Sequence, residues 1–192
     1  MQNNAAMQNR VKLLMDEYLP ATYLYHNYKH CEDVRASAVE IGTHEKINKD
    51  EIRLLETAAL WHDVGYIKMR TGHEEESCRM AKENLPDYGF NDAEIKTICG
   101  MIMATKAPQS PMNNLEKIIA DADLAYLGSE EAFAKAENLF EELHSADPSL
   151  TKEKWNKTQI KFLQSHKYFT QYGKEIYEPL KQAYLERLLN QY

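Results

Sequence analysis

Apolar residues recur at helical spacing along most of this chain, and no segment alternates apolar and polar residues as an exposed strand does. The pattern predicts successive helices near residues 11–19, 30–47, 51–63, 72–86, 92–106, 115–128, 130–144, 152–169 and 174–190. No repeat, low-complexity tract or clear linker interrupts them. The sequence therefore predicts an all-α fold, a single-domain helical bundle that spans residues 1–192.

Helix ends are marked by residues suited to those positions. Asn48 with Glu51, and Asn91 with Glu94, have the spacing of a capping box. Ser129 and Thr151 are expected to cap the two helices that follow them. Pro179 is expected to start or kink the last helix, because proline has no N–H to donate inside a helix.

Composition and charge narrow the functional classes. The 192 residues carry 23 Lys plus Arg against 30 Asp plus Glu, a net charge of −7. Such an acidic chain is a poor candidate for binding nucleic acid or anionic membranes. The 3 cysteines show no CxxC pair, so reduced thiols and a cytoplasmic location are expected. No apolar run approaches the length of a membrane span. Whether the chain forms a homodimer is left open.

Histidines and aspartates gather in a few apolar settings. His62 and Asp63 are adjacent at the end of "LLETAALWHDVG", and Asp121 and Asp123 interrupt the apolar "IIADADLAYLG". Buried ionisable groups need a partner or a metal. One divalent cation would satisfy them together, and imidazole with carboxylate suits Mn, Fe, Co, Ni or Zn, whereas carboxylate with water suits Mg.

Taken in order, "YHNYKHCEDV", "WHDVGY" and "ADADLAYLG" resemble the motifs of the HD-domain metal-dependent phosphohydrolases, and the first is similar to the YHNxxHxxDV motif of cyclic-nucleotide phosphodiesterases. The resemblance covers about residues 20–130, with the C-terminal helices completing the pocket. It implies an all-α HD-type domain whose metal ligands are His30, His62, Asp63 and Asp123. Asp123 is preferred to Asp121 because it lies in the "AD-x-L"-like setting.

The resemblance also implies catalytic roles. His26 would protonate the leaving oxygen. In the hydrolysis that these residues would support, Asp63 or another acid near the metal would accept a proton from the attacking water. Thr105 and Lys106 stand where binuclear relatives often have a histidine, so one metal ion per chain is expected.

Several side chains are candidates for binding a small phosphorylated substrate. Lys106 is the best cation for a phosphate, although it also fits a charge at a helix C-terminus. His166 fits a pocket wall or an exposed helix end equally well, and Lys29 and Arg70 are weaker candidates. His73 fits either a metal ligand or a residue at a helix start, and Asp121 fits a supporting or surface role better than ligation.

Three functions follow from these residues. The leading one is hydrolysis of a small phosphoester, a nucleotide or cyclic nucleotide. A di-iron oxygenase of HD type is the second, and it would require His73 as an extra ligand. A non-catalytic sensor that binds a nucleotide is the third.

Overall fold

A computed structural model of the protein describes residues 2–191, so the two ends of the predicted domain, residues 1 and 192, lie outside the described part. The α-helices are α1 (Gln2–Tyr18), α2 (Tyr28–His44), α3 (Lys49–Trp61), α4 (His73–Asn84), α5 (Asp92–Ala104), α6 (Asn114–Asp123), α7 (Ala132–Ala146), α8 (Lys152–Ser165) and α9 (Glu178–Leu189). Short 3-10 turns η1 (Val64–Ile67), η2 (Leu85–Tyr88) and η3 (Ala125–Gly128), and the π-helical turn η4 (Gly173–Tyr177), connect some of them. No strand occurs within residues 2–191, which confirms the all-α prediction.

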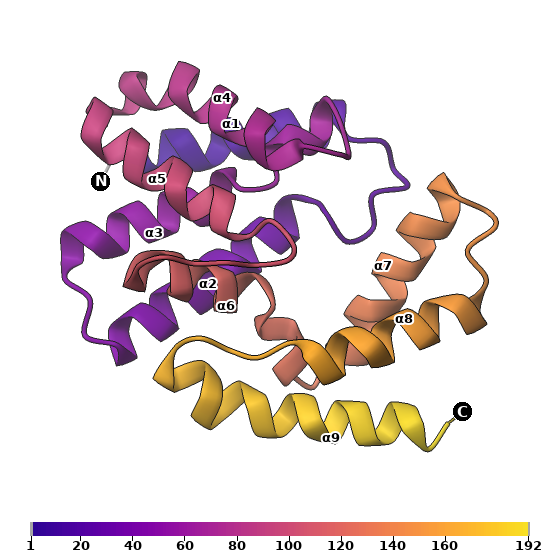
Figure 1. Ribbon diagram of the computed structural model, residues 1–192. Coiled ribbons are helices and arrows are strands. Elements are labelled where there is room, and N and C mark those ends of the chain that lie inside the picture. The colour runs from indigo at the N-terminus through magenta and orange to yellow at the C-terminus, as the bar shows by residue number, and fades with distance from the viewer. Residues whose placement is uncertain (1, 192) are drawn as a thin grey trace.

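The first six helices enclose the larger apolar core. Helix α2 packs against α3 and α6, and α5 packs against α3, α4 and α6 (Figure 1). On α2, Val34, Ala38 and Ile41 are buried and Val39 is partly buried. This core holds α2, α3 and α6 together, and the predicted metal ligands lie at their ends.

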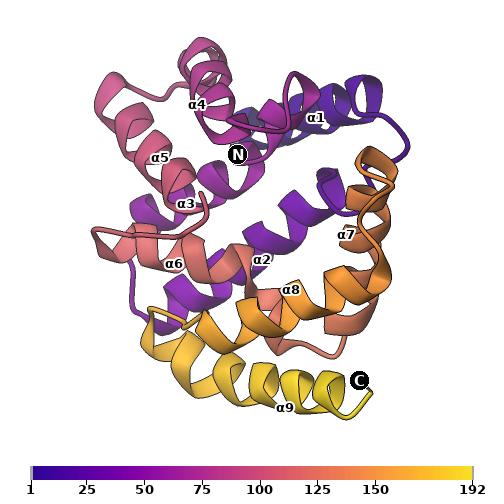
Figure 2. The same cartoon turned by 45° about the vertical axis from the view of Figure 1, so that its right-hand side comes forward.

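The last three helices form a second apolar cluster with η3. Phe140 of α7, Trp155 of α8 and Tyr184 of α9 are among its buried residues. Figure 2 shows α7, α8 and α9 lying along one side of the first six helices. The C-terminal helices therefore supply a separate wall beside the site. Among residues 2–191, no helix is both long and apolar enough to cross a membrane.

The predicted caps are mostly confirmed. Asn48 and Asn91 form capping boxes with Glu51 and Glu94, and the Thr151 side chain accepts the N–H of Lys154. Pro179 lies in the first turn of α9, as expected. The prediction that Ser129 caps α7 is wrong. Helix α7 begins only at Ala132, and the Ser129 hydroxyl accepts the N–H of Glu131 in the turn before the helix.

Several helices end earlier than their apolar patterns predict, and three of these ends affect the site. Helix α3 ends at Trp61, so His62 and Asp63 lie in a turn rather than in a helix. Helix α6 ends at Asp123, although the apolar pattern continues through the 3-10 turn η3. Helix α8 ends at Ser165, because the N–H groups of Phe169 and Thr170 donate to the buried Asp121 carboxylate and not to helix carbonyls. Two of these ends place a predicted ligand where the chain turns.

Gly65 allows the chain to turn sharply after Asp63. A Cβ atom on Gly65 would lie 2.0 Å from the His73 carbonyl oxygen and 2.8 Å from the Ser77 nitrogen. The Gly65 N–H also donates to the Ser77 hydroxyl at 2.8 Å. The start of α4 can therefore approach the His62-Asp63 turn only because residue 65 has no side chain.

Candidate metal centre and active site

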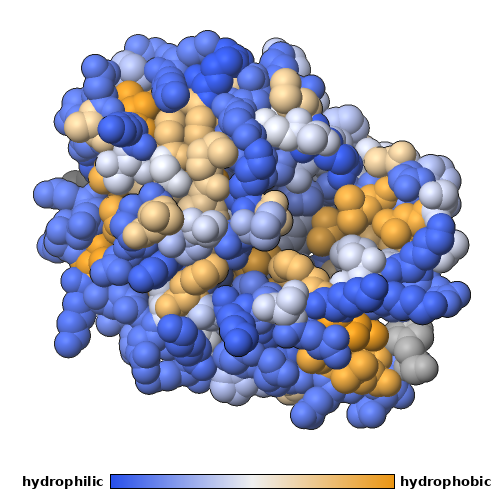
Figure 3. Space-filling model, in the orientation of Figure 1, coloured by the Kyte–Doolittle hydropathy of each residue, from blue (hydrophilic) through white to orange (hydrophobic). Residues whose placement is uncertain are grey.

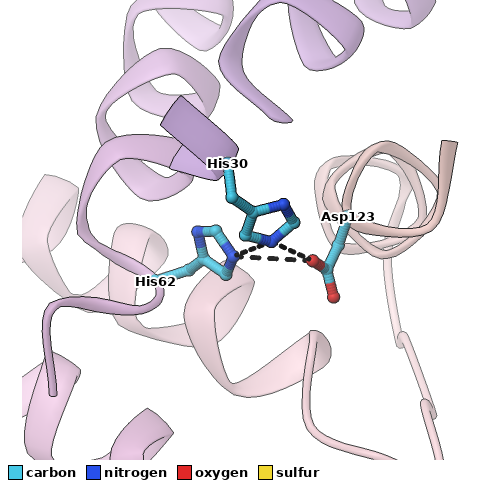
Figure 4. Close-up of side chains that lie close together, drawn as sticks. All are labelled: His30, His62 and Asp123. Atoms are coloured by element: carbon cyan, nitrogen blue, oxygen red, sulfur yellow. Dashed lines mark hydrogen bonds and ion pairs between the residues drawn. The ribbon is translucent and has the colours of Figure 1, made fainter. Parts of the chain in front are cut away.

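His30, His62 and Asp123 converge from three separate elements (Figure 4). His30 lies in the first turn of α2, His62 directly follows α3, and Asp123 is the last residue of α6. One ligand atom from each lies within 4.8 Å of the others. His30 Nε2 is 3.1 Å from Asp123 Oδ1 and 3.4 Å from His62 Nε2. Two imidazoles and a carboxylate at such separations form a suitable set for a divalent transition metal.

Asp63 adds a fourth donor beside these three. Its Oδ2 is 3.3 Å from His62 Nε2 and 3.5 Å from His30 Nε2. The same oxygen is buried, and it has no hydrogen-bond partner among the described residues. An unpartnered buried carboxylate oxygen facing two imidazole nitrogens fits a bound cation. The residues thus fit the metal that the sequence predicts.

The ring orientation of His62 supports this assignment. His62 Nδ1 lies 2.7 Å from the Ala59 carbonyl oxygen, which can only accept, so Nδ1 carries the hydrogen. In the neutral ring Nε2 then presents a lone pair toward the Asp63 and Asp123 oxygens. Such a backbone contact on the second nitrogen is how metal-binding histidines are commonly oriented.

Without a metal, protons would have to offset the carboxylates. Burial by itself lowers the pKa of His62, but the charges of Asp63 and Asp123 outweigh it and raise that pKa well above its usual value. Burial raises the pKa of Asp63, and the neighbouring His62 more than reverses that effect, so the pKa of Asp63 is lowered. Without a metal, the carboxylates thus hold a proton on His62, and a cation bound among them would take the place of that proton.

His26 lies next to this cluster and is oriented by Glu142. His26 Nδ1 is 2.6 Å from Glu142 Oε1, and the backbone N–H groups of Tyr25 and His26 donate to Oε2 at 3.0 Å. Hydrogen bonding to His26 outweighs the effect of burial and lowers the pKa of Glu142, so this carboxylate is ionised and can only accept. Nδ1 therefore carries a hydrogen, and Nε2 is the nitrogen available to a ligand.

His73 is the first residue of α4 and faces two carboxylates. Its Nδ1 donates to the Arg70 carbonyl oxygen at 2.9 Å, while Nε2 is 3.5 Å from Asp63 Oδ1 and 3.6 Å from Glu74 Oε1. The ring stacks on Tyr66 with the centroids 3.9 Å apart. The N-cap is Gly72, so His73 does not cap the helix. A proton or a cation is needed between Nε2 and these oxygens.

Asp121 is committed elsewhere. It is fully buried and accepts the N–H groups of Phe169 and Thr170 and the Thr170 hydroxyl, the last at 2.6 Å. Burial dominates these contacts and raises the pKa of Asp121. Asp121 therefore binds the segment after α8 to α6, and Asp123 is the aspartate that lies beside His30 and His62.

A cavity of about 810 Å³ opens beside the cluster. Its lining includes His26, Asp63, His73, Asp123 and His166. The pKa of His166 is lowered to about 4 by burial and by the nearby Lys181 ammonium, so the ring is uncharged at neutral pH. His166 thus lies in the pocket wall, one of the two positions that the sequence left open, and it is a neutral group there and not a cation for phosphate.

The two predicted phosphate-binding lysines do not line this cavity. Lys106 forms an ion pair with Glu75, and its side chain is 43% exposed. Lys29 pairs with Asp33, and its side chain is 75% exposed. The weaker candidate Arg70 contacts Glu142 at 3.3 Å. The cavity instead includes Lys167, for which no ion pair is found within residues 2–191.

Sequence reasoning missed Glu142 and Lys167. Glu142 lies in "FEELH", where its neighbour Glu141 is exposed and nothing in the local pattern distinguishes the two. Its partner His26 lies 116 residues away in the chain, and a contact over that distance leaves no trace in the spacing of apolar and polar residues. Lys167 directly follows His166. The suggestion that His166 lines a pocket was therefore the one sequence feature that could have pointed to Lys167.

Comparison with known proteins agrees with this geometry. The family model for the HD domain matches residues 27–125, about half of the chain. The chain belongs to the HD-domain family. Membership supports a metal-dependent hydrolase in general terms. The match covers all four predicted metal ligands, His30, His62, Asp63 and Asp123, and begins one residue after His26.

Two solved structures share the fold of this HD-domain protein. A predicted HD superfamily hydrolase from an uncultured Thermotogales bacterium is 20% identical, with a TM-score of 0.62 over 97% of this chain and 91% of the other. Bacillus subtilis YpgQ, in complex with ADP, is 17% identical, with a TM-score of 0.66 over 100% of this chain and 95% of YpgQ. No curated protein sequence matches significantly.

Proposed function

We propose that the protein hydrolyses a small phosphoester, a nucleotide or a cyclic nucleotide, with the help of a divalent metal ion. The observation that carries this proposal is the buried Asp63 Oδ2, which has no hydrogen bond and lies 3.3 Å from His62 Nε2 and 3.5 Å from His30 Nε2, beside a large cavity. A buried carboxylate oxygen without a hydrogen bond is costly unless it binds a ligand. His26, the proposed proton donor, lines the same cavity.

His30, His62, Asp63 and Asp123 would hold the metal ion. A divalent metal bound there would lower the pKa of a bound water and neutralise charge on the phosphate. Asp63 is the carboxylate placed to accept a proton from the attacking water. The site binds one metal in this proposal, in keeping with the sequence prediction.

His26 would protonate the leaving oxygen. Its Nδ1 is bound to Glu142, so a proton can leave only from Nε2. Glu142 is a positioning residue, since it fixes the ring without touching the substrate. Lys167 is the cavity cation that would contact the phosphate, in place of Lys106 and Lys29.

Two observations support a nucleotide as the substrate. The cavity wall includes the rings of Phe162, His166 and Phe169, and flat aromatic surfaces of this kind suit a ligand that contains rings. The crystal structure of YpgQ, which shares the fold, is of that protein in complex with ADP. A volume of about 810 Å³ is also in the usual range for a ligand of this size.

Elemental analysis of the purified protein, followed by a nucleotide and phosphoester panel with the metal restored, tests the proposal. We expect one divalent metal ion per chain and release of phosphate from at least one nucleotide. D63A and H62A should lose the metal, whereas H26A should retain it and lose rate. Wild-type metal content and activity in D63A would show that the site is assigned wrongly.

A di-iron site is a second candidate, favoured by His73. His73 Nε2 lies near both Asp63 and Glu74, so a second metal has donors in this place. This candidate predicts two irons per chain and oxygen consumption with an organic substrate. A metal-loaded protein that binds nucleotides without turnover would instead support the sensor function.

A further inference from the structure

A second, smaller cavity of about 260 Å³ adjoins the active-site cavity. The two share His26, Asp123, Leu124 and Phe162 as lining residues, so they meet where the metal cluster and the proposed proton donor lie. Hydrophobic residues gather over α7 beside a hollow in this face of the molecule (Figure 3).

The smaller cavity differs from the larger one in chemistry. Its walls include Tyr126, Leu139, Trp155 and Phe162, and the ionisable groups that line it, apart from two tyrosines, are His26 and Asp123 at the shared boundary. Burial raises the pKa of Tyr126 well above its usual value, so that hydroxyl is neutral. The larger cavity has Asp63, Glu74 and Lys167.

The position of His26 assigns a direction to the bound substrate. The phosphorus must lie toward the metal ligands, and the leaving oxygen must lie near His26 Nε2. His26 is at the boundary between the cavities, so the group attached to that oxygen extends into the smaller one. When the P–O bond breaks, water adds to phosphorus, and the alcohol leaves with the proton from His26.

We infer that the smaller cavity is the leaving-group pocket and that it selects phosphate esters whose alcohol carries a flat, uncharged ring. This inference rests on the proposed function. Aromatic and aliphatic walls favour a flat apolar ring, and a second charged group would be buried there without a partner. An uncharged nucleobase fits this chemistry, and a sugar bearing a second phosphate does not.

Most of the pocket lies outside the segment that matches the family. Tyr126, Leu139, Trp155 and Thr158 come from η3, α7 and α8, whereas the HD match ends at residue 125. The metal ligands are thus provided by the shared helices, and the leaving-group walls by the helices that follow them.

Thr158 offers a way to fill the pocket without disturbing the core. It is exposed on α8 and lines the pocket, whereas its neighbour Lys157 is exposed, pairs with Glu153 and lines neither cavity. T158W places a large ring in the pocket, and K157W places the same ring on the adjacent surface. We would compare AMP with ribose 5-phosphate, which has the same ester oxygen without a base.

The wild-type protein should prefer AMP by kcat/KM. T158W should reduce the ratio of kcat/KM for AMP to that for ribose 5-phosphate by about tenfold or more, and K157W should keep the wild-type ratio. A ratio that is unchanged in T158W, or no preference for AMP in the wild-type protein, would overturn the inference.

Binding of adenosine alone separates this inference from the proposed function. Calorimetry should show that adenosine binds the wild-type protein and K157W, and binds T158W about tenfold more weakly. If no phosphoester is hydrolysed but this pattern holds, the proposed function fails and the pocket assignment stands. If adenosine does not bind, or binds T158W as well as wild type, the pocket assignment fails.

Discussion

At the scale of single residues, Glu142 orients the proposed proton donor through a hydrogen bond to the His26 ring. It is fully buried and orients the His26 ring, while its neighbour Glu141 is exposed. E142Q retains the shape of the side chain but removes the charged acceptor, so it no longer fixes Nδ1 as the donor. We predict that E142Q lowers kcat by roughly tenfold or more at unchanged metal content.

E141Q is the matched control for this prediction and should behave as wild type. The pH profile of kcat distinguishes two roles for Glu142: it should change if Glu142 orients His26, and it should stay the same if Glu142 only stabilises the fold. E142Q should alter that profile, because the ring loses the carboxylate that fixes its hydrogen bond. Unchanged kcat and pH profile in a folded E142Q protein would contradict the assigned role.

Asp121 and Asp123 should respond differently to the same substitution. D121N leaves part of the Phe169 and Thr170 donors without an acceptor, so it should lower the free energy of unfolding by about 2 kcal/mol and retain the metal. D123N should lose the metal. Elemental analysis and urea unfolding of the two variants provide the measurements. If D121N lost the metal and D123N kept it, Asp121 would be the ligand in place of Asp123.

At the scale of elements, we expect His166, at the junction of α8 and α9, to make the stability of the fold depend on pH. His166 caps α8, and Lys181, fully buried on α9, donates to the His166 carbonyl oxygen at 2.5 Å. With a pKa of about 4 in the fold and about 6.5 when unfolded, His166 binds a proton only in the unfolded chain between these pH values. Its contribution to stability is therefore complete above about pH 6.5 and is lost as the pH falls toward 4.

We predict that H166Q loses part of the pH dependence of folding. Between about pH 7.5 and about pH 5, the wild-type free energy of unfolding should fall by more than that of H166Q, by on the order of 1–2 kcal/mol. Urea unfolding at both pH values measures this difference. H44Q changes a half-exposed histidine and should keep the wild-type slope. Equal slopes in H166Q and wild type would contradict the prediction.

Most elements could be predicted from the sequence, because apolar periodicity and caps such as Asn48 and Asn91 are local signals. The early ends of α3 and α8 could not, because they depend on contacts with distant residues. Gly65 meets the backbone of α4, and Asp121 binds the N–H groups after α8. The same reason explains the site: His30, His62 and Asp123 lay in motifs, whereas Glu142 was identified only by its position in space.

At the scale of the whole molecule, a metal ion held by residues from α2, α6 and the turn after α3 would join three elements and should stabilise the fold. A ligand that binds only the folded state at about 100 times its Kd adds about 2.7 kcal/mol. We predict that saturating Mn²⁺ raises the Tm of the chelator-treated protein by about 5 °C or more. D63N should lose most of this shift, which differential scanning calorimetry would measure. An equal shift in D63N would indicate metal binding elsewhere.

The Glu142 carboxylate also affects when activity can appear. It accepts the backbone N–H groups of Tyr25 and His26 as well as the His26 ring, and it belongs to α7, in the second apolar cluster. A nascent chain could assemble the metal ligands from α2, α3 and α6 before α7 has been synthesised. Its proposed proton donor would stay unoriented until α7 docks, so we expect full activity to appear only when folding is nearly complete.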